Sequence, residues 1–212
     1  MTHSSLPSLS VRGLTLSRGP RRLFADLKWD LDAGSAMVLR GPNGCGKTTL
    51  LRVIAGLTRP ESGEVRLGGA PWKALNAEQR RNCLYLGHSA ALKEELSVDA
   101  NLSCALDCDA ESVDADALAA ALAAVGLGER RHLEARRLSQ GQKRRVGLAR
   151  LALSAKPMWL LDEPTNALDA EGVALFLRLV ERHLGAGGMA CIATHLPMDI
   201  GAPVREIRLG SA

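Results

Sequence analysis

The chain has 212 residues, of which 46% are hydrophobic and 24% charged, and its formal net charge is +4. This balance is that of an ordinary globular domain, and the charge is too small to indicate nucleic-acid binding by itself. The five cysteines form no Cys-x-x-Cys pair, which argues against a disulfide scaffold or a zinc site and for a reducing compartment.

Strands and turns fill the first part of the chain. Apolar residues alternate with polar ones in two segments before residue 32, which predicts two strands, the first of them kinked at Gly13. A short apolar run then predicts a buried strand, and a helix closed by Gly56 follows. The predicted strands are 9–16, 24–31, 36–39, 64–67 (at a sheet edge) and 83–86, and the predicted helix is 47–55.

Helical spacing takes over at Leu96 and lasts until strands return at Met158. Asp114 is a good N-cap for one of these helices, and Gly126 is a good C-cap. The sequence therefore predicts one domain over residues 1–212, an α/β core interrupted by a helical insertion over residues 90–155. The predicted helices are 97–106, 114–125, 139–153 and 170–184, and the predicted strands are 158–161, 190–193 and 204–209.

The segment from Gly41 to Thr48 matches the phosphate-binding pattern G-x-x-x-x-G-K-[ST] at every required position. Its glycines let backbone N–H groups point at a polyphosphate, Lys47 adds a charge for the β- and γ-phosphates, and the Thr48 hydroxyl can ligate Mg²⁺. The strand before it and the helix after it are the context that makes this pattern a site. The nucleotide-contacting residues expected here are Gly41, Pro42, Asn43, Gly44, Cys45, Gly46, Lys47, Thr48 and Thr49.

Two acids follow the apolar strand that begins at Met158. A buried strand would deliver Asp162 beside the phosphate loop, where its carboxylate would hold Mg²⁺ together with Thr48. Glu163 would lie further toward the γ-phosphate and polarise the attacking water. Acids are common at strand ends, so the upstream phosphate loop is what makes this pair informative.

Ser139 opens the third predicted helix of the insertion. A serine is a good N-cap, and the free N–H groups at a helix start attract anions. The alternative is a well-capped helix that binds no ligand. The basic residues nearby, at 136–137 and 143–145, are more typical of a solvated helix face than of nucleic-acid binding.

These motifs, in this order, resemble the ATP-binding cassette family. Residues 138–142, LSQGQ, resemble its signature, usually LSGGQ, and the acid pair, Asn166 to Asp169 and Thr194-His195 follow as they do in that family. The resemblance covers almost the whole chain. It implies an α/β P-loop NTPase fold, the nucleotide-binding domain of that family, with a mixed core, an antiparallel β edge and a helical subdomain.

The resemblance also assigns roles. It implies an ATPase that uses ATP and Mg²⁺, with Lys47, Glu163 and His195 as catalytic residues, His195 being the switch histidine that contacts the γ-phosphate. It implies a homodimer across ATP, in which the signature of one subunit caps the γ-phosphate held by the other, and Asp169 belongs to the loop that joins the two sites. The signature residues are Leu138, Ser139, Gln140, Gly141 and Gln142.

Two positions depart from the family pattern. Ser89 stands where the family has a Gln that touches Mg²⁺ and senses the membrane subunit, and it would reach Mg²⁺ through a water; His88 is the alternative. The aromatic residue on which the family stacks adenine is missing, and Arg18 can stack its guanidinium plane instead.

Cys45 lies inside the phosphate loop, next to a helix N-terminus and near Lys47. Positive charge and free N–H groups favour the thiolate over the thiol. We therefore expect Cys45 to be the most reactive thiol of the chain and to be protected by bound ATP.

The segment from Tyr85 to His88, with Asn101-Leu102, is similar to the ATP-binding subunits of the cytochrome c maturation export system, the heme exporters. That likeness implies an energy-coupling subunit that hydrolyses ATP for heme handling in c-type cytochrome biogenesis. It would bind separate integral-membrane permease subunits at the cytoplasmic face of the bacterial inner membrane. The alternatives are the ATPase of another ABC transporter, for a lipid, drug or metal, and a non-transport ABC ATPase.

No apolar run approaches the ~20 residues that span a bilayer. The first ten residues have neither the basic start nor the apolar core of a signal peptide. We therefore expect a cytoplasmic, peripheral protein with no direct membrane insertion and no nucleic-acid partner. The membrane protein that co-purifies with the chain would separate the heme reading from the other transporters.

Overall fold

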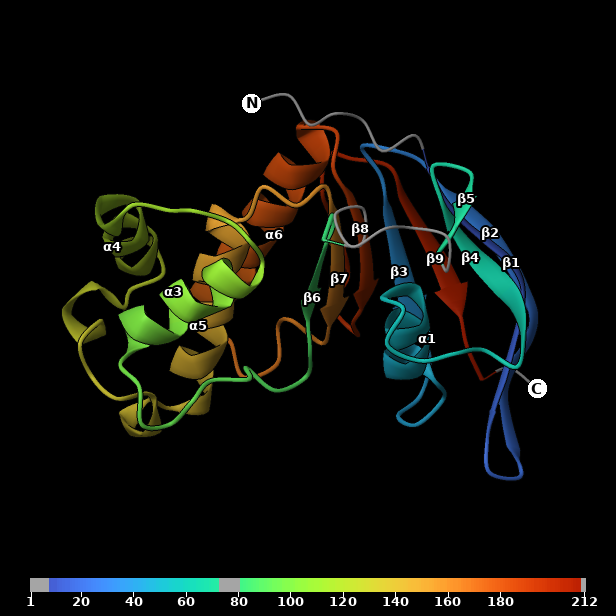
Figure 1. The fold of residues 1–212 in the computed structure, drawn as a ribbon, viewed down its shortest axis with the longest axis horizontal. Coiled ribbons are helices and arrows are strands. Elements are labelled where there is room, and N and C mark those ends of the chain that lie inside the picture. The colour runs from blue at the N-terminus through green and yellow to red at the C-terminus, as the bar shows by residue number, and fades with distance from the viewer. Residues whose placement is uncertain (1–7, 73–80, 211–212) are drawn as a thin grey trace. The chain divides into compact units, whose positions relative to one another are not determined.

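The computed structural model describes residues 8–72 and 81–210, and contacts divide the chain into two compact units (Figure 1). The first unit comprises residues 1–85, 156–163 and 181–212, and the second comprises residues 86–155 and 164–180. The strands of the described residues belong to the first unit, apart from the last residue of one of them, whereas the second unit is helical. Within the described ranges, no helix combines the length and the apolar character needed to cross a membrane.

A four-stranded antiparallel sheet in the first unit has the order β2-β1-β4-β5. Its strands are β1 (Leu9–Arg18), β2 (Arg21–Leu31), β4 (Ser62–Leu67) and β5 (Ala70–Pro71). The predicted kink in β1 is confirmed, because Gly13 has a φ of 62° and the register with β2 shifts between Val11 and Leu14. The prediction that residues 64–67 form an edge strand is wrong: β4 pairs with β1 on one side and with the two-residue β5 on the other.

A five-stranded sheet in the same unit has the order β6-β7-β8-β3-β9. Its strands are β3 (Ala36–Arg40), β6 (Cys83–Leu86), β7 (Met158–Asp162), β8 (Met189–Ala193) and β9 (Val204–Arg208). The pairs β7–β8, β8–β3 and β3–β9 are parallel. Parallel strands deliver the residues that follow them to one edge of the sheet, and such edges are where α/β folds bind ligands.

One hydrophobic core joins the two sheets of this unit to α1 (Lys47–Ile54). Leu50 and Leu51 of the helix are fully buried in it, together with apolar residues of β1, β3 and β7. Side chains alternate along a strand, so Trp159 of β7 faces the other way, where it stacks on His183 with ring centroids 3.8 Å apart. His183 belongs to α6 (Ala170–Gly185). Both faces of the central strands are thereby covered.

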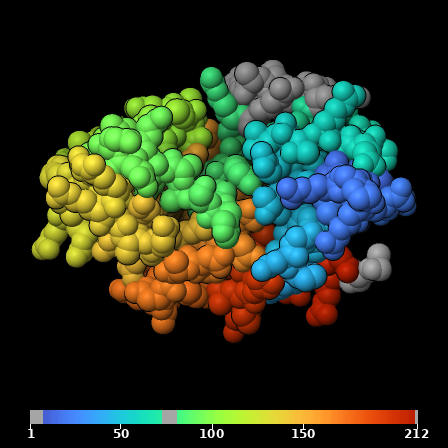
Figure 2. All heavy atoms as spheres, turned by 90° about the horizontal axis from the view of Figure 1, so that it is seen from below, coloured from blue at the N-terminus to red at the C-terminus, as the bar shows by residue number. Residues whose placement is uncertain are grey.

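The second unit contains α3 (Val98–Cys108), α4 (Ala115–Ala124), α5 (Gln140–Leu153) and the first part of α6. The predicted helices of this stretch are confirmed, and so is the Asp114 cap, whose carboxylate accepts from the Ala117 N–H at 2.7 Å. Gly126, just past the end of α4, has a φ of 75°, which glycine adopts at little cost. Seen from below (Figure 2), the loop after β6, in green, lies beside the residues that open α5, in yellow to orange.

Candidate functional site

The phosphate loop joins the end of β3 to the start of α1, as the sequence predicts. Gly41, Gly44 and Gly46 have positive φ values of 141°, 76° and 109°, which only glycine adopts readily. At Gly41 a Cβ atom would lie 2.4 Å from the Leu209 carbonyl oxygen, so a side chain cannot fit there. The backbone therefore curls tightly before α1, and the N-terminus of that helix is free to face an anion.

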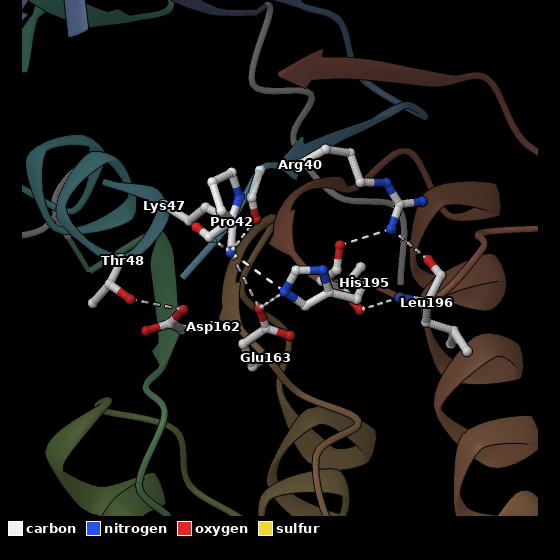
Figure 3. Close-up of polar contacts among 10 residues, drawn as sticks. Arg40, Pro42, Lys47, Thr48, Asp162, Glu163, His195 and Leu196 are labelled. Carbon is white, nitrogen blue, oxygen red and sulfur yellow. Dashed lines mark hydrogen bonds and ion pairs between the residues drawn. The ribbon is translucent and has the colours of Figure 1, made fainter. Parts of the chain in front are cut away.

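Lys47 curls back over the loop that precedes it (Figure 3). Its side chain is only 7% exposed, and its Nζ donates to the Gly41 carbonyl at 2.8 Å and to the Pro42 carbonyl at 3.4 Å. The same ammonium lies 3.7 Å from Glu163 Oε1 and 3.5 Å from His195 Nε2. A buried cation held by carbonyl oxygens is well placed to exchange them for phosphate oxygens.

Thr48 and Asp162 meet on the other side of Lys47 (Figure 3). The Thr48 hydroxyl donates to Asp162 Oδ1 at 3.1 Å, whereas the buried Asp162 Oδ2 has no hydrogen-bond partner among the described residues. A buried, unpaired carboxylate oxygen is costly unless something binds it. A hydroxyl and a carboxylate are hard oxygen ligands of the kind Mg²⁺ prefers, with water and phosphate completing its shell, so the donor set fits this ion.

Glu163 follows β7 in an uncommon backbone conformation. Its φ is 47°, and its N–H donates to the Ala193 carbonyl at 2.8 Å, which ties the start of this turn to the end of β8. The carboxylate is 12% exposed, and its Oε1 lies 3.5 Å from His195 Nε2, whereas the His195 side chain is 60% exposed. A carboxylate beside an ammonium and an imidazole can accept a proton from water.

The signature residues lie in the second unit, at the start of α5. Ser139 is the N-cap: its hydroxyl accepts from the Gln142 N–H at 3.2 Å, and the Gln142 side chain accepts from the Ser139 N–H at 3.0 Å. This capping box is the arrangement expected for a stable helix start. At Gly141 a Cβ atom would lie 2.7 Å from the Ala167 carbonyl oxygen, so glycine lets the helix start approach the segment before Asp169.

Asp169 opens α6 within the second unit. Its Oδ1 accepts from the Gly172 N–H at 2.9 Å, and the Arg145 guanidinium donates to its two oxygens at 2.7 and 2.9 Å. The Gly172 N–H and then the Arg145 side chain lower the pKa of Asp169 below its ordinary value. The carboxylate is therefore ionised at neutral pH and joined to α5.

Ser89 and His88 lie exposed in the loop after β6, in the second unit. A cavity of about 520 Å³ opens beside them, lined also by Leu92, Gln140 and Asn166. Sequence reasoning missed what holds this loop. The Arg144 guanidinium, which is buried, donates to the Gly87 and His88 carbonyls at 3.0 and 2.6 Å.

Asn101 holds the other end of that loop, a role that the sequence did not indicate. Its side-chain amide donates to the carbonyls of Lys93, Leu96 and Ser97 at 3.0 to 3.1 Å, and its Oδ1 accepts from the Lys93 N–H at 2.7 Å. A buried amide that satisfies so many backbone groups fixes their arrangement. The loop is thus anchored at both ends by side chains from helices.

Arg18 ends β1 and is exposed next to the turn that leads to β2, where its Cα partner is Arg21. Among the predicted site residues, the first unit contains the phosphate loop, Asp162, Glu163, His195 and Arg18. The second holds Ser89, the signature and Asp169.

The burial of Cys45 argues against the prediction that it is the most reactive thiol of the chain. Its side chain is 1% exposed, because the loop backbone closes over it: a Cβ atom at Gly41 would lie 2.7 Å from Cys45 Sγ. The exposed cysteines are Cys104 and Cys108 on α3. Access of the reagent to sulfur decides the order of reaction before thiolate chemistry does.

Limiting maleimide is therefore expected to label Cys104 and Cys108 first. Burial raises the pKa of Cys83 to about 12, so its thiolate is scarce at pH 8, and burial likewise raises the pKa of the fully buried Cys191. Peptide mapping by mass spectrometry after short reaction times gives the order. Labelling of Cys45 ahead of both α3 cysteines in the folded chain would contradict this burial argument.

Comparisons with known sequences place these motifs among related proteins. The ABC transporter family profile matches residues 24–166. The cytochrome c biogenesis ATP-binding export protein CcmA of Rhodopseudomonas palustris (strain BisB18) is 50% identical over 205 residues, 96% of this chain and 98% of that protein. The CcmA protein of Dechloromonas aromatica (strain RCB) is 45% identical over 203 residues, 95% of this chain and 100% of that protein.

Solved structures share the fold. A putative ABC transporter ATP-binding protein from Pyrococcus furiosus has a TM-score of 0.80 at 23% identity, covering 94% of this chain and 96% of that one. The ATP-binding cassette MJ0796, in a dimeric post-hydrolysis state bound to ADP and Pi, has a TM-score of 0.76 at 21% identity, covering 89% and 88%. The predicted fold class is thereby confirmed.

Proposed function

This chain belongs to the ATP-binding cassette family, among the cytochrome c biogenesis ATP-binding export proteins, and we propose that it hydrolyses ATP to drive heme handling for c-type cytochrome assembly. The observation that carries the proposal is the cluster of Lys47, Thr48, Asp162, Glu163 and His195 at one edge of the sheet, in a chain 50% identical to such a protein. We take residues 1–212 as one ATPase domain.

The residues of the first unit divide the work on ATP. The phosphate loop, residues 41–49, would bind the phosphates through backbone N–H groups, and Lys47 would leave its loop carbonyls for the β- and γ-phosphate oxygens. Arg18 would stack on adenine. Thr48 and Asp162 would hold Mg²⁺, which when bound neutralises phosphate charge.

Hydrolysis would then depend on Glu163 and His195. The Glu163 carboxylate, with Oε1 near Lys47 Nζ and His195 Nε2, would accept the proton of the attacking water. His195 would donate to the γ-phosphate from the end of β8. Its largely exposed ring leaves it free to reach a ligand. Removing a general base of this kind typically costs ~10²–10⁴ in rate.

A second copy of the chain would complete each site. Ser139 and Gly141 lie at the start of α5, and a helix N-terminus attracts an anion; we propose that they cap the γ-phosphate held by the other copy. The solved cassette with ADP and Pi is described as dimeric, which supports this arrangement. Asp169 would lie in the loop between the two sites.

Separate integral-membrane permease subunits would receive the energy of hydrolysis, with this chain peripheral on the cytoplasmic face of the bacterial inner membrane. The loop that carries Ser89 is the surface we assign to them, because it is exposed between its two anchors. The alternatives are the ATPase of another ABC transporter and a non-transport ATPase. The description of the relatives favours the cytochrome c role.

Affinity purification from detergent-solubilised membranes of the native host tests this assignment. We expect membrane proteins of cytochrome c assembly to co-purify with the tagged chain, and deletion of its gene to abolish c-type cytochromes detected by heme staining. Co-purification of only an unrelated permease, with normal cytochromes in the deletion strain, would instead favour another transporter.

Ser89→Gln is expected to keep the ATPase activity of the isolated chain and to raise its stimulation by the membrane partner. The longer amide would restore a group that can reach Mg²⁺ and the attacking water. Partner-stimulated ATPase rates of wild type, Ser89→Gln and Ser89→Ala give the comparison. If neither variant differs from wild type in either assay, the hydroxyl has no role and His88 becomes the better candidate.

A further inference from the structure

Arg40 is the last residue of β3 and directly precedes the phosphate loop. Its side chain is 17% exposed and lies between β8 and β9, the two strands that flank β3 in the sheet (Figure 3). Its Nε and Nη2 donate to Glu206 Oε1 at 3.0 and 2.8 Å. The fork of the guanidinium is therefore fixed in direction by an acid on β9.

The third nitrogen of that fork binds the segment after β8. Arg40 Nη1 donates to the Thr194 carbonyl at 2.7 Å and to the Leu196 carbonyl at 2.8 Å. A guanidinium is the side chain suited to such an arrangement, because its donors lie in one rigid plane. Arg40 Nη1 thus binds the backbone carbonyls of the two residues that flank a single residue.

The residue between those carbonyls is His195. Its ring is 60% exposed, and the contacts it makes with Lys47 and Glu163 are long, at 3.5 Å each. Side-chain packing therefore does little to hold the imidazole. The local backbone is fixed by Arg40 and by the Leu196 N–H, which donates to Thr194 Oγ1 at 3.0 Å.

We infer that Arg40 is a positioning residue, which holds the backbone on both sides of His195 and so places the imidazole for ATP hydrolysis. The inference rests on the proposed function for the role of His195. It also ties the start of the phosphate loop to the histidine, because Arg40 and Gly41 are neighbours in the chain. A misplacement of about 1 Å at a reacting group can cost ~100-fold in rate.

Two variants separate the fork from the charge. Arg40→Met removes both, and Arg40→Lys keeps the charge but cannot donate to Glu206 and to two carbonyls at once. We expect both to lower kcat by about 10- to 100-fold with little change in the KM for ATP. The matched control is Arg208→Met, an exposed arginine that faces Arg40 in the β3–β9 register, and it should keep the wild-type kcat.

A double-variant comparison shows whether Arg40 acts through His195. We expect Arg40→Met combined with His195→Ala to be no slower than His195→Ala alone. Multiplied losses, or a wild-type kcat in Arg40→Lys, would overturn the inference.

Ring NMR signals of ¹³C-labelled histidine in the nucleotide-free chain report the environment of the His195 ring independently of ATP hydrolysis. His195→Gln identifies the signal among the five histidines. We expect it to shift or broaden in Arg40→Met, while the signal of His183, stacked on Trp159, stays in place and shows that the fold is intact. An unmoved His195 signal would overturn the inference. Full activity of His195→Ala would instead refute its role in the proposed function, separately from this readout.

Discussion

Glu163→Gln is expected to bind ATP like wild type and to hydrolyse it ~10²–10⁴ times more slowly. The amide has the shape of the carboxylate, so the contacts near Lys47 and His195 can persist, but an amide cannot take a proton from water. Because ATP then stays bound, the variant should accumulate as a dimer in the presence of ATP. Single-turnover hydrolysis and size-exclusion chromatography with and without Mg-ATP measure both effects.

Glu64→Gln is the matched control for this experiment. Glu64 lies on β4 and contacts Arg66, so its neutralisation should leave both hydrolysis and elution unchanged. A Glu163→Gln chain that turns over at the wild-type rate would refute the assignment of the general base. Asp162, the residue before it, would then be the next carboxylate to test.

Lys47→Ala is expected to weaken ATP binding by ~30-fold or more. The Lys47 ammonium is nearly buried and donates to the Gly41 carbonyl. Without this side chain, a phosphate bound in the loop would lack its strongest cationic partner. Losing one partner of a buried, hydrogen-bonded charge pair costs about 2–5 kcal/mol. Isothermal titration with ATP gives the affinity directly.

Arg52→Ala is the matched control for Lys47→Ala, because Arg52 lies on the same helix but is exposed near its end. It should bind ATP with wild-type affinity. Wild-type affinity in Lys47→Ala would mean that the loop does not hold the phosphates. Loss of binding in both variants would point to a damaged helix instead.

The strands and helices of the described residues follow from local patterns of the sequence. Where the predicted bounds or pairings of strands were wrong, the cause is also local. The pairing of β4 on its second side was missed because β5 is only Ala70–Pro71, which carries no strand signal. β2 begins at Arg21, earlier than predicted. The prediction missed this start because the first residues of the strand are exposed arginines without apolar alternation. Helical spacing indicated the insertion over residues 90–155, but the grouping of residues 164–180 with it follows from contacts that periodicity does not report.

At the site, the phosphate loop and the acid pair could be found from spacing because each is a local motif. Arg40 could not be found in this way. Its partner carbonyls belong to Thr194 and Leu196, more than 150 residues further along the chain, and they are backbone groups that every residue carries. Arg144 and Asn101, which anchor the loop after β6, also bind backbone carbonyls, and such groups carry no sequence signal. The burial of Cys45 depends on backbone packing around the phosphate loop.

In the proposed dimer, each ATP site combines the phosphate loop of one copy with Ser139 of the other. A chain carrying both Ser139→Arg and Glu163→Gln, added in excess to wild type, tests this sharing. In a mixed dimer, the wild-type loop meets the altered Ser139 position, and the wild-type Ser139 meets a loop without its base. The ATPase rate per wild-type chain should therefore fall as the excess rises.

Ser139→Arg alone is the control for that titration, because every wild-type Ser139 can still complete one intact site on the variant chain. We expect a rate that falls steeply with the double variant and changes little with Ser139→Arg alone. A wild-type rate that is undiminished by a large excess of the double variant would contradict the shared site, and with it the mechanism proposed for this chain.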